Sequence, residues 1–115
     1  MNKLTDFFKL LSDETRLRIM VLLLHGEFCV CQLTGITGLP QPNVSKHLAK
    51  LRDMGFVKDE RKEQYIFYSL TIQDPIFSSI LETIVLNLTD YPVLVSDGEK
   101  SQSAAKYMEM AGSCQ

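Results

Sequence analysis

Two cysteines with a single residue between them, Cys29 and Cys31, are the side chains of this sequence best suited to chemistry. The pattern around them predicts a helix that begins at about Cys29, and the aligned backbone amides at a helix N-terminus favour the thiolate form of a nearby cysteine. Thiolates bind soft, thiophilic ions. The pair therefore predicts an ion site, and the alternative is two buried cysteines that act as small hydrophobic side chains.

Residues two apart on a regular helix point about 200° away from each other. Two sulfurs placed in this way cannot hold one small ion, so ion binding is expected to unwind or rotate the first turn of the helix. The third cysteine, Cys114, lies in the tail and is a candidate third ligand; a solvent molecule or a small thiol is the other option. Three cysteines do not suit a secreted disulfide framework, and free thiols fit a reducing cytoplasm.

Hydrophobic periodicity predicts the elements that must position these cysteines. Apolar residues at a helical period indicate five helices, over residues 4–11, 13–24, 29–37, 42–54 and 75–88. Ser12 is expected to cap the second of these helices, and Gly55 to follow the fourth as its C-terminal stop. A change to a period of two indicates strands over residues 56–58 and 64–70. Beyond residue 91 the pattern weakens, and only residues 101–111 suit a further short helix.

Two short helices joined by a Gly/Pro turn and followed by a hairpin describe a winged helix-turn-helix, in a mostly α chain with a β-hairpin wing. The helix over residues 42–54 can insert its polar face into the major groove of DNA. The candidate DNA-binding residues on this helix and its first turn, and then on the hairpin, are Gln41, Asn43, Ser45, Lys46, His47, Lys50, Arg61 and Lys62. The sequence thus predicts a binder of double-stranded DNA; for Lys46 and Lys50 alone, a solvated helix face is an equal alternative.

The net charge of −2 argues mildly against nucleic acid binding, because domains with this function are often strongly basic. Charge is unevenly distributed, however, and residues 41–64 carry six basic against four acidic side chains. This local excess predicts DNA binding that is sensitive to salt. No segment has the roughly 18 uninterrupted apolar residues of a membrane span, and the amphipathic start does not suit a signal peptide. A cytoplasmic protein without a membrane contact is expected.

Three stretches of the sequence are distinctive in combination, and they read SDETRLRIMVLLL, FCVCQL and QPNVSKHLAKLRDMGFVKDERKEQYIFYSL. Together they closely resemble the ArsR/SmtB family of metal-responsive repressors, and the resemblance covers residues 4–88. It implies a homodimer, formed through the first and last helices, that binds an imperfect palindrome in DNA and releases it on binding its inducer. It also implies a recognition helix and a wing that carry Gln41, Asn43, Ser45, Lys46, Lys50, Arg61 and Lys62.

The resemblance further implies that the CVC stretch binds arsenite or antimonite through Cys29 and Cys31, so As(III) or Sb(III) is the expected inducer. Many arsenite-responsive relatives have a third cysteine where this sequence has Thr34, which leaves Cys114 as the remaining thiol. The zinc site of the family is not expected, because residues 74–88 contain no histidine. Its cadmium and lead site is not expected either, because it needs additional N-terminal cysteines.

Two positions depart from the family pattern. Pro40 stands where relatives usually have a serine that caps the recognition helix, and Glu63 stands where arsenite-responsive relatives usually have a glycine at the wing tip. The first departure removes a capping hydrogen bond, and the second bears on the type of turn. Neither departure removes the fold.

The helix over residues 75–88 has a broad apolar face that one small domain cannot cover with its own chain. Dimerisation through this helix, helped by the first helix, follows from this face as well as from the resemblance. We expect a DNA-binding and dimerisation domain over residues 1–90. Residues 91–115 are expected to form a C-terminal extension that is partly ordered or flexible.

Other functions remain open for a cysteine pair in this sequence. One is a repressor on the same fold that senses oxidants or sulfide through a disulfide or polysulfide, although a disulfide between residues two apart is strained. A thiol oxidoreductase is disfavoured, because the sequence lacks a Gly-rich phosphate loop, a supported nucleophile–base set and a thioredoxin-like order of elements, so no enzyme is expected. A protein-interaction module without DNA binding is the last alternative.

Overall fold

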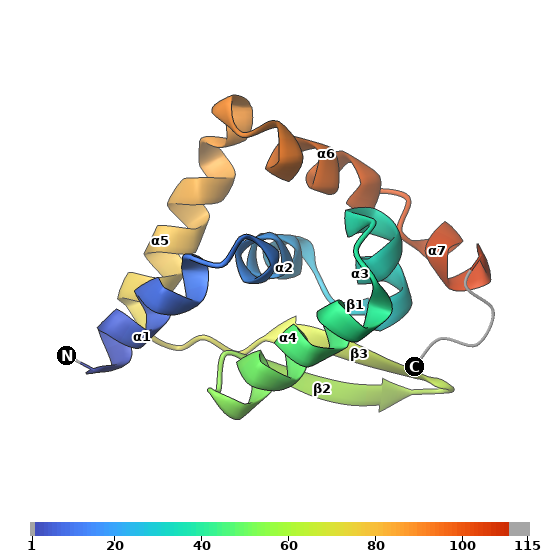
Figure 1. Ribbon diagram of the computed structural model, residues 1–115, viewed down its shortest axis with the longest axis horizontal. Coiled ribbons are helices and arrows are strands. Elements are labelled where there is room, and N and C mark those ends of the chain that lie inside the picture. The colour runs from blue at the N-terminus through green and yellow to red at the C-terminus, as the bar shows by residue number, and fades with distance from the viewer. Residues whose placement is uncertain (1, 111–115) are drawn as a thin grey trace.

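Residues 2–110, the part of the chain that the computed structural model describes, form a mostly helical molecule with a three-stranded sheet (Figure 1). The elements in chain order are α1 (Asn2–Leu11), α2 (Glu14–His25), β1 (Phe28–Cys29), α3 (Val30–Thr37), α4 (Gln41–Asp53), β2 (Val57–Lys62), β3 (Tyr65–Leu70), α5 (Pro75–Leu86), η1 (Leu88–Asp90), α6 (Pro92–Ser101) and α7 (Ala105–Met110). Helices α3 and α4 form the helix-turn-helix, and β2 and β3 form the wing. The predicted winged helix-turn-helix is confirmed.

A short strand ties the wing to the helix-turn-helix, and the sequence analysis missed it. In β1, Phe28 pairs with Tyr68 and Cys29 with Phe67, both antiparallel, so the order of strands is β1-β3-β2. At Phe67 and Tyr68, the edge of β3 that β2 leaves free is therefore paired with another strand. The predicted helix start at Cys29 is wrong by one residue, because Cys29 belongs to this strand and α3 begins at Val30.

Three phenylalanines from distant parts of the chain join α1, the start of the wing and α5. The rings of Phe7 and Phe77 are stacked with centroids 4.2 Å apart, and Phe56 packs at a tilt against both, at 5.7 and 5.9 Å. All three side chains are buried. Since the rings come from α1, from the bend before β2 and from α5, this cluster joins α1 to α5.

The turns at the helix ends agree with the sequence in most places, with one correction. Asp13, rather than Ser12, caps α2, because its carboxylate accepts a hydrogen bond from the Arg16 amide at 3.0 Å. The Ser12 hydroxyl still belongs to the end of α1 and donates to the Lys9 carbonyl at 2.6 Å. Gly55 follows α4 with φ +84°, a left-handed backbone that favours glycine, as predicted.

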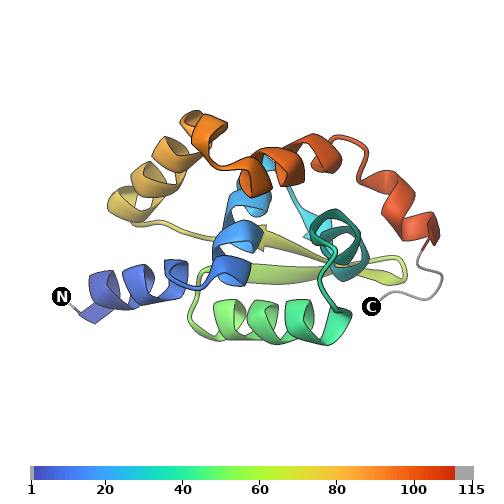
Figure 2. The same ribbon diagram turned by 45° about the horizontal axis from the view of Figure 1, so that its top comes forward.

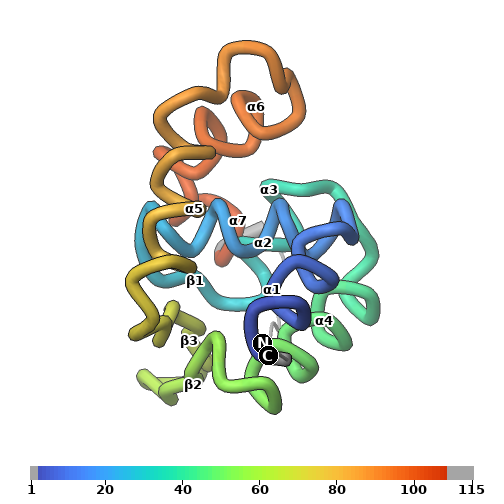
Figure 3. The backbone as a smooth tube through the Cα atoms, turned by 90° about the vertical axis from the view of Figure 1, so that its left-hand side faces the viewer, coloured from blue at the N-terminus to red at the C-terminus, as the bar shows by residue number. Residues whose placement is uncertain are grey.

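Residues 92–110 form two helices, of which α6 lies at the end of the molecule opposite the wing (Figure 3). Helix α6 packs against α2 and α3, and α7 packs against α3. A Cβ atom added at Gly35 of α3 would collide with the ring of Tyr107 of α7, so these two helices are in close contact. The only helix expected in this region was over residues 101–111; α7 lies within that range, and α6 was not expected.

A buried ion pair attaches α6 to the helix-turn-helix. The Arg18 guanidinium donates from Nε and Nη2 to the two carboxylate oxygens of Asp97, each at 2.9 Å, and its Nη2 also donates to the Thr37 carbonyl at 3.0 Å. Asp97 is 2% exposed. The hydrogen bonds to Asp97 raise the pKa of Arg18 further above its ordinary value. Arg18 therefore joins α2, α6 and the last residue of α3.

Helix α6 and the wing lie at opposite ends of the molecule. Figure 3 places α6 at one end and the hairpin with α4 at the other. Figure 2 shows α4 running beside the hairpin, with the N-terminal helix α1 in the same lower layer. No helix in residues 2–110 is long and apolar enough to cross a bilayer.

The ion pair predicts a strong dependence of stability on Asp97. Asp97→Asn should lower the free energy of unfolding by about 3 kcal/mol, because it leaves the Arg18 guanidinium buried without its counter-ion. Glu99→Gln removes an exposed carboxylate from the same helix and should change stability by less than about 0.5 kcal/mol. Urea unfolding followed by circular dichroism measures both values. Equal effects of the two substitutions would show that the pair does not hold α6 in place.

Candidate functional site

Cys29 occupies the junction between the sheet and the helix-turn-helix. It ends β1 and is the N-cap residue of α3, with an extended backbone at φ −87° and ψ 171°. Its amide donates to Gln32 Oε1 at 3.0 Å, inside the core. The premise that both cysteines lie within a regular helix is therefore wrong for Cys29. The 200° separation that would have required α3 to unwind does not apply to this pair.

The side chains of both cysteines are buried. Cys29 is 0% exposed and Cys31, in the first turn of α3, is 4% exposed. Cys29 is a free thiol, whereas Cys31 is disulfide-bonded. Cys114 lies outside the described residues. Within residues 2–110 no three side chains of the metal-ligating types come together, so the described cysteines form at most part of a metal site.

One polar atom near the cysteines has no partner. The hydroxyl of Thr34, one turn after Cys31 on α3, is buried and has no hydrogen-bond partner in the described part of the chain. Buried hydroxyls are nearly always hydrogen-bonded, so an unsatisfied one marks a place where a water or a polar ligand is accommodated. Thr34 is three residues after Cys31, so the two side chains lie on the same face of α3.

Helix α4 presents most of its predicted DNA-binding residues to solvent. Gln41, Asn43, Lys46 and Lys50 are exposed, and Ser45 and His47 are half-buried. Pro40 is the N-cap residue and makes no capping hydrogen bond, as expected for this departure. Opposite this surface, Val44, Leu48 and Leu51 are fully buried and anchor the helix in the core.

The half-buried side chain of His47 lies near the start of α2. Burial lowers the pKa of its imidazole, and the carboxylate of Asp13 opposes that shift. Asp13 is the N-cap of α2, so His47 lies where α4 crosses α2. His47 thus differs from Lys46 and Lys50, whose side chains are exposed.

Arg61 and Lys62, the two candidate DNA-binding cations of the wing, differ in their ion pairing. Arg61 and Lys62 follow each other in β2, so their side chains leave opposite faces of the hairpin. Arg61 is exposed and has no ion pair in the described part of the chain, whereas Lys62 pairs with Glu27 in the loop before β1. That hydrogen bond raises the pKa of Lys62. Nothing in the sequence links residues 35 positions apart, so this pairing could not be predicted.

A second ion pair sets the hairpin against the recognition helix. Arg52 at the end of α4 donates from Nη1 to Asp59 Oδ2 on β2 at 3.1 Å. The same bond raises the pKa of Arg52. Because both groups are exposed, the pair contributes little to stability but restrains the angle between α4 and the wing.

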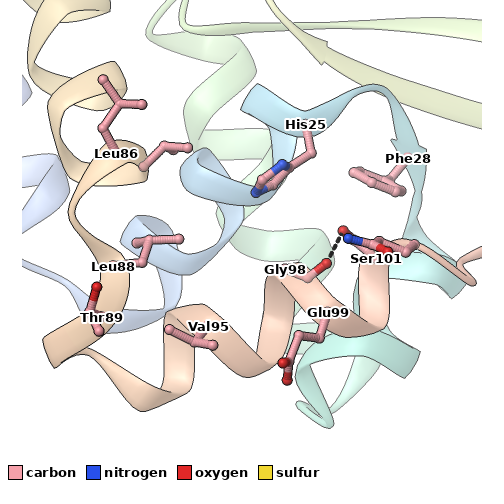
Figure 4. A pocket seen from close by; sticks show the side chains of 11 residues that line it. His25, Phe28, Leu86, Leu88, Thr89, Val95, Gly98, Glu99 and Ser101 are labelled. Carbon is pink, nitrogen blue, oxygen red and sulfur yellow. Dashed lines mark hydrogen bonds between the residues drawn. The ribbon is translucent and has the colours of Figure 1, made fainter.

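Away from this surface, a cavity of about 620 Å³ lies between the end of α2, the end of α5 and α6 (Figure 4). His25, Phe28 and Val95 are among its lining residues. The Ser101 hydroxyl, also in its wall, donates to the Gly98 carbonyl at 2.6 Å and is thus satisfied within α6. Phe28 precedes Cys29 in β1, so the cavity touches the strand that carries the buried thiol.

Together, the helix-turn-helix, the hairpin and the third strand define a winged helix-turn-helix protein. Residues 13–59 match the family described as bacterial regulatory protein, arsR family, and the chain belongs to this family. A family of regulatory proteins agrees with the predicted regulator and not with a thiol oxidoreductase.

Comparison with individual proteins supports the same assignment. The arsenic resistance transcriptional regulator ArsR1 of Pseudomonas putida is 46% identical over 69 residues, which cover 59% of this chain and 54% of that relative. The match thus spans about half the length of that relative. The crystal structure of the transcriptional repressor BigR from Xylella fastidiosa has a TM-score of 0.66 and 31% identity, over 78% of this chain and 87% of that chain. The antimony-specific transcriptional repressor AntR has a TM-score of 0.65 and 28% identity, over 77% and 79%.

The turn at the wing tip generates a prediction. Glu63 lies between the two wing strands with φ +60°, so the turn needs a left-handed backbone although it lacks a glycine. Glu63→Gly should raise the free energy of unfolding by about 1 kcal/mol, because a left-handed backbone costs an L-residue about that much. Glu63→Ala removes the same carboxylate but keeps a Cβ atom, and should give no such gain. A glycine variant no more stable than the alanine variant in thermal unfolding would show that the turn is unstrained.

Proposed function

We propose that this protein is a cytoplasmic, homodimeric repressor of transcription that binds double-stranded operator DNA and releases it when arsenite or antimonite binds at Cys29 and Cys31. The observation that carries this proposal is the position of Cys29, which belongs both to the strand that pairs with the wing and to the N-terminus of α3. A ligand held there acts on both elements of a winged helix-turn-helix at once. The similarity to ArsR1, an arsenic resistance regulator, and to AntR, an antimony-specific repressor, supports the choice of ligand.

DNA binding is supported by the surface that α4 and the hairpin form. Gln41, Asn43, Lys46 and Lys50 are exposed on α4, beside Arg61 on the wing. Amide side chains at the start of the helix can contact base edges, and the lysines can contact phosphates. Ser45 and His47 are half-buried and belong to the rim of this surface.

A homodimer is supported by apolar side chains left open on α1 and α5, the two helices that the phenylalanine cluster joins. Phe8 of α1 is 50% exposed and Ile76 of α5 is 54% exposed, and Leu86 at the end of α5 is exposed further still. Large apolar side chains gathered on neighbouring helices are typical of an interface. We assign this face to contact with a second copy of the chain, which would present two recognition helices to a palindromic site.

The ligand site is proposed to consist of the sulfurs of Cys29 and Cys31, with Cys114 as a third sulfur. Cys114 lies outside the described residues, and the helix that precedes it supports this assignment. Helix α7, which precedes it in the chain, packs on α3 through the contact of Tyr107 with Gly35.

The coupling between the ligand and DNA follows from the bonds that Cys29 makes. Its backbone holds the β1–β3 pairing, and its amide holds Gln32 at the start of α3. We infer that a ligand that holds the buried sulfurs of Cys29 and Cys31 together strains these bonds and so changes the position of the wing relative to α3. A difference of 1–3 kcal/mol between the two conformations is enough for regulation.

The DNA-binding face is tested with one lysine. A duplex with two half-sites about one helical turn apart should bind a dimer, and Lys50→Ala should reduce the slope of log affinity against log salt by about one unit. Fluorescence anisotropy over a series of salt concentrations measures this slope. Lys100→Ala, on α6 at the opposite end of the molecule, is the matched control and should leave the slope unchanged. Salt-independent binding of the wild type would mean that the proposed face is wrong.

The ligand site is tested by release from DNA. Arsenite or antimonite should dissociate the wild-type complex and Zn(II) should do so poorly, whereas Cys29→Ser and Cys31→Ser should each bind DNA and fail to release it. The assays use a phosphine reductant, because dithiols would compete for arsenite. A Cys31→Ser protein that leaves DNA at the arsenite concentration effective for the wild type would refute the assignment.

The third sulfur is tested by X-ray absorption. The spectrum should show three sulfur neighbours around arsenic in the wild type and two in Cys114→Ser. Identical spectra for the two proteins would restrict the site to Cys29 and Cys31 with a small thiol or water.

A second candidate is a repressor on the same fold that responds to oxidants or sulfide. The observation that favours it is the disulfide at Cys31. The two candidates differ in one measurement, because a redox repressor releases DNA when oxidised without arsenite and rebinds it after addition of the phosphine. An arsenite-responsive repressor releases DNA while fully reduced.

A further inference from the structure

The loop between α2 and β1 carries an acidic side chain that reaches across to the wing. Glu27 Oε1 accepts a hydrogen bond from Lys62 Nζ, and the two side chains form an ion pair although they are far apart in sequence. Both remain partly open to water, with 41% and 45% of their side chains exposed. The pair is therefore accessible to a competing anion.

Lys62 lies over the sheet rather than projecting from the tip of the hairpin. Its strand, β2, is at the far edge of the sheet from β1, with β3 between them. To reach Glu27 the side chain of Lys62 crosses β3, and its ammonium lies 5.6 Å from the centre of the Phe67 ring. The cation is thus held by a carboxylate and by an aromatic face at the same time.

Arg61, the cation next to Lys62 in β2, differs from Lys62 in its contacts. Arg61 leaves the other face of β2, is exposed, and forms no ion pair in residues 2–110. Of the two cations at the wing tip, one is therefore free for phosphate and the other is already neutralised by a group of the protein itself.

From this geometry we propose that Glu27 competes with DNA phosphate for Lys62 and so lowers the affinity of the protein for DNA. This inference rests on the proposed DNA-binding function and adds to it a residue that sets the affinity. In the free protein Lys62 is bound to Glu27; on DNA a backbone phosphate takes the place of the carboxylate. Glu27 is two residues before Cys29, so the same short segment carries the ligand thiol and the group that restrains the wing cation.

A double-mutant cycle with Glu27→Gln and Lys62→Gln tests the competition. Glu27→Gln should tighten binding to a duplex by up to about fivefold, since exposed ion pairs are weak. It should also steepen the slope of log affinity against log salt by up to about one unit, because Lys62 becomes free to displace one more counter-ion. In the Lys62→Gln background, Glu27→Gln should have little effect on either quantity. Fluorescence anisotropy of the four proteins supplies the affinities, and circular dichroism checks that each is folded.

Glu63→Gln is the matched control, because it removes a carboxylate from the same hairpin that forms no ion pair in the described part of the chain. It should change affinity by the same factor with and without Lys62. A gain from Glu27→Gln that is equal in both backgrounds would overturn the inference, since it would reflect only the loss of a negative charge near DNA. An unchanged affinity and slope would also overturn it. A wild-type protein that binds no DNA would instead refute the proposed function itself.

Discussion

The pairing of β1 with β3 determines how the parts of this molecule are related. Only two residues, Phe28 and Cys29, form this strand, yet they fix the hairpin to the segment that leads directly into the helix-turn-helix. The hairpin also packs against α2, α3 and α4, but only this pairing joins it by strand hydrogen bonding to the segment before α3. Because Cys29 also caps α3, the orientation of the wing and the start of the helix-turn-helix depend on the same few backbone bonds.

The C-terminal end of α3 is held by contacts from α2 and α6. Arg18 holds the carbonyl of Thr37, just before the turn that leads to α4, and it is itself held by Asp97 of α6. Helix α3 is therefore fixed at its start by a strand and at its end by a buried cation. A helix held at both ends transmits a displacement at one end to its neighbours, instead of absorbing it by local bending.

The sequence was sufficient for elements that bury an apolar face at a regular period. Val44, Leu48 and Leu51 of α4 are an example, because their spacing alone indicates which side of the helix enters the core. It was not sufficient where a polar residue points inward. Asp97 is a core residue of α6, but a hydrophobicity pattern counts it as exposed, so α6 was not predicted. Strand β1 was missed because two residues are too few to display an alternation.

The same distinction applies to the candidate site. The cysteine pair, the polar face of α4 and the wing cations can be identified from residue types and their order along the chain. The relations among them cannot, since the pairing of Cys29 with Phe67 and of Lys62 with Glu27 depends on contacts between segments that are distant in sequence. For Cys29 a local signal was present, because a glutamine three residues after a helix cap commonly bonds back to the cap amide, as Gln32 does.

The complete burial of Cys29 has a consequence for the rate at which any thiol reagent can react with it. A sulfur enclosed by core side chains is reached only during brief local openings, and the structure closes again between them. At low reagent concentration the reaction accelerates in proportion to the reagent. At high concentration it levels off at the opening rate, which is a property of the fold. The time that this cysteine needs to respond therefore has a lower limit that no excess of reagent can shorten.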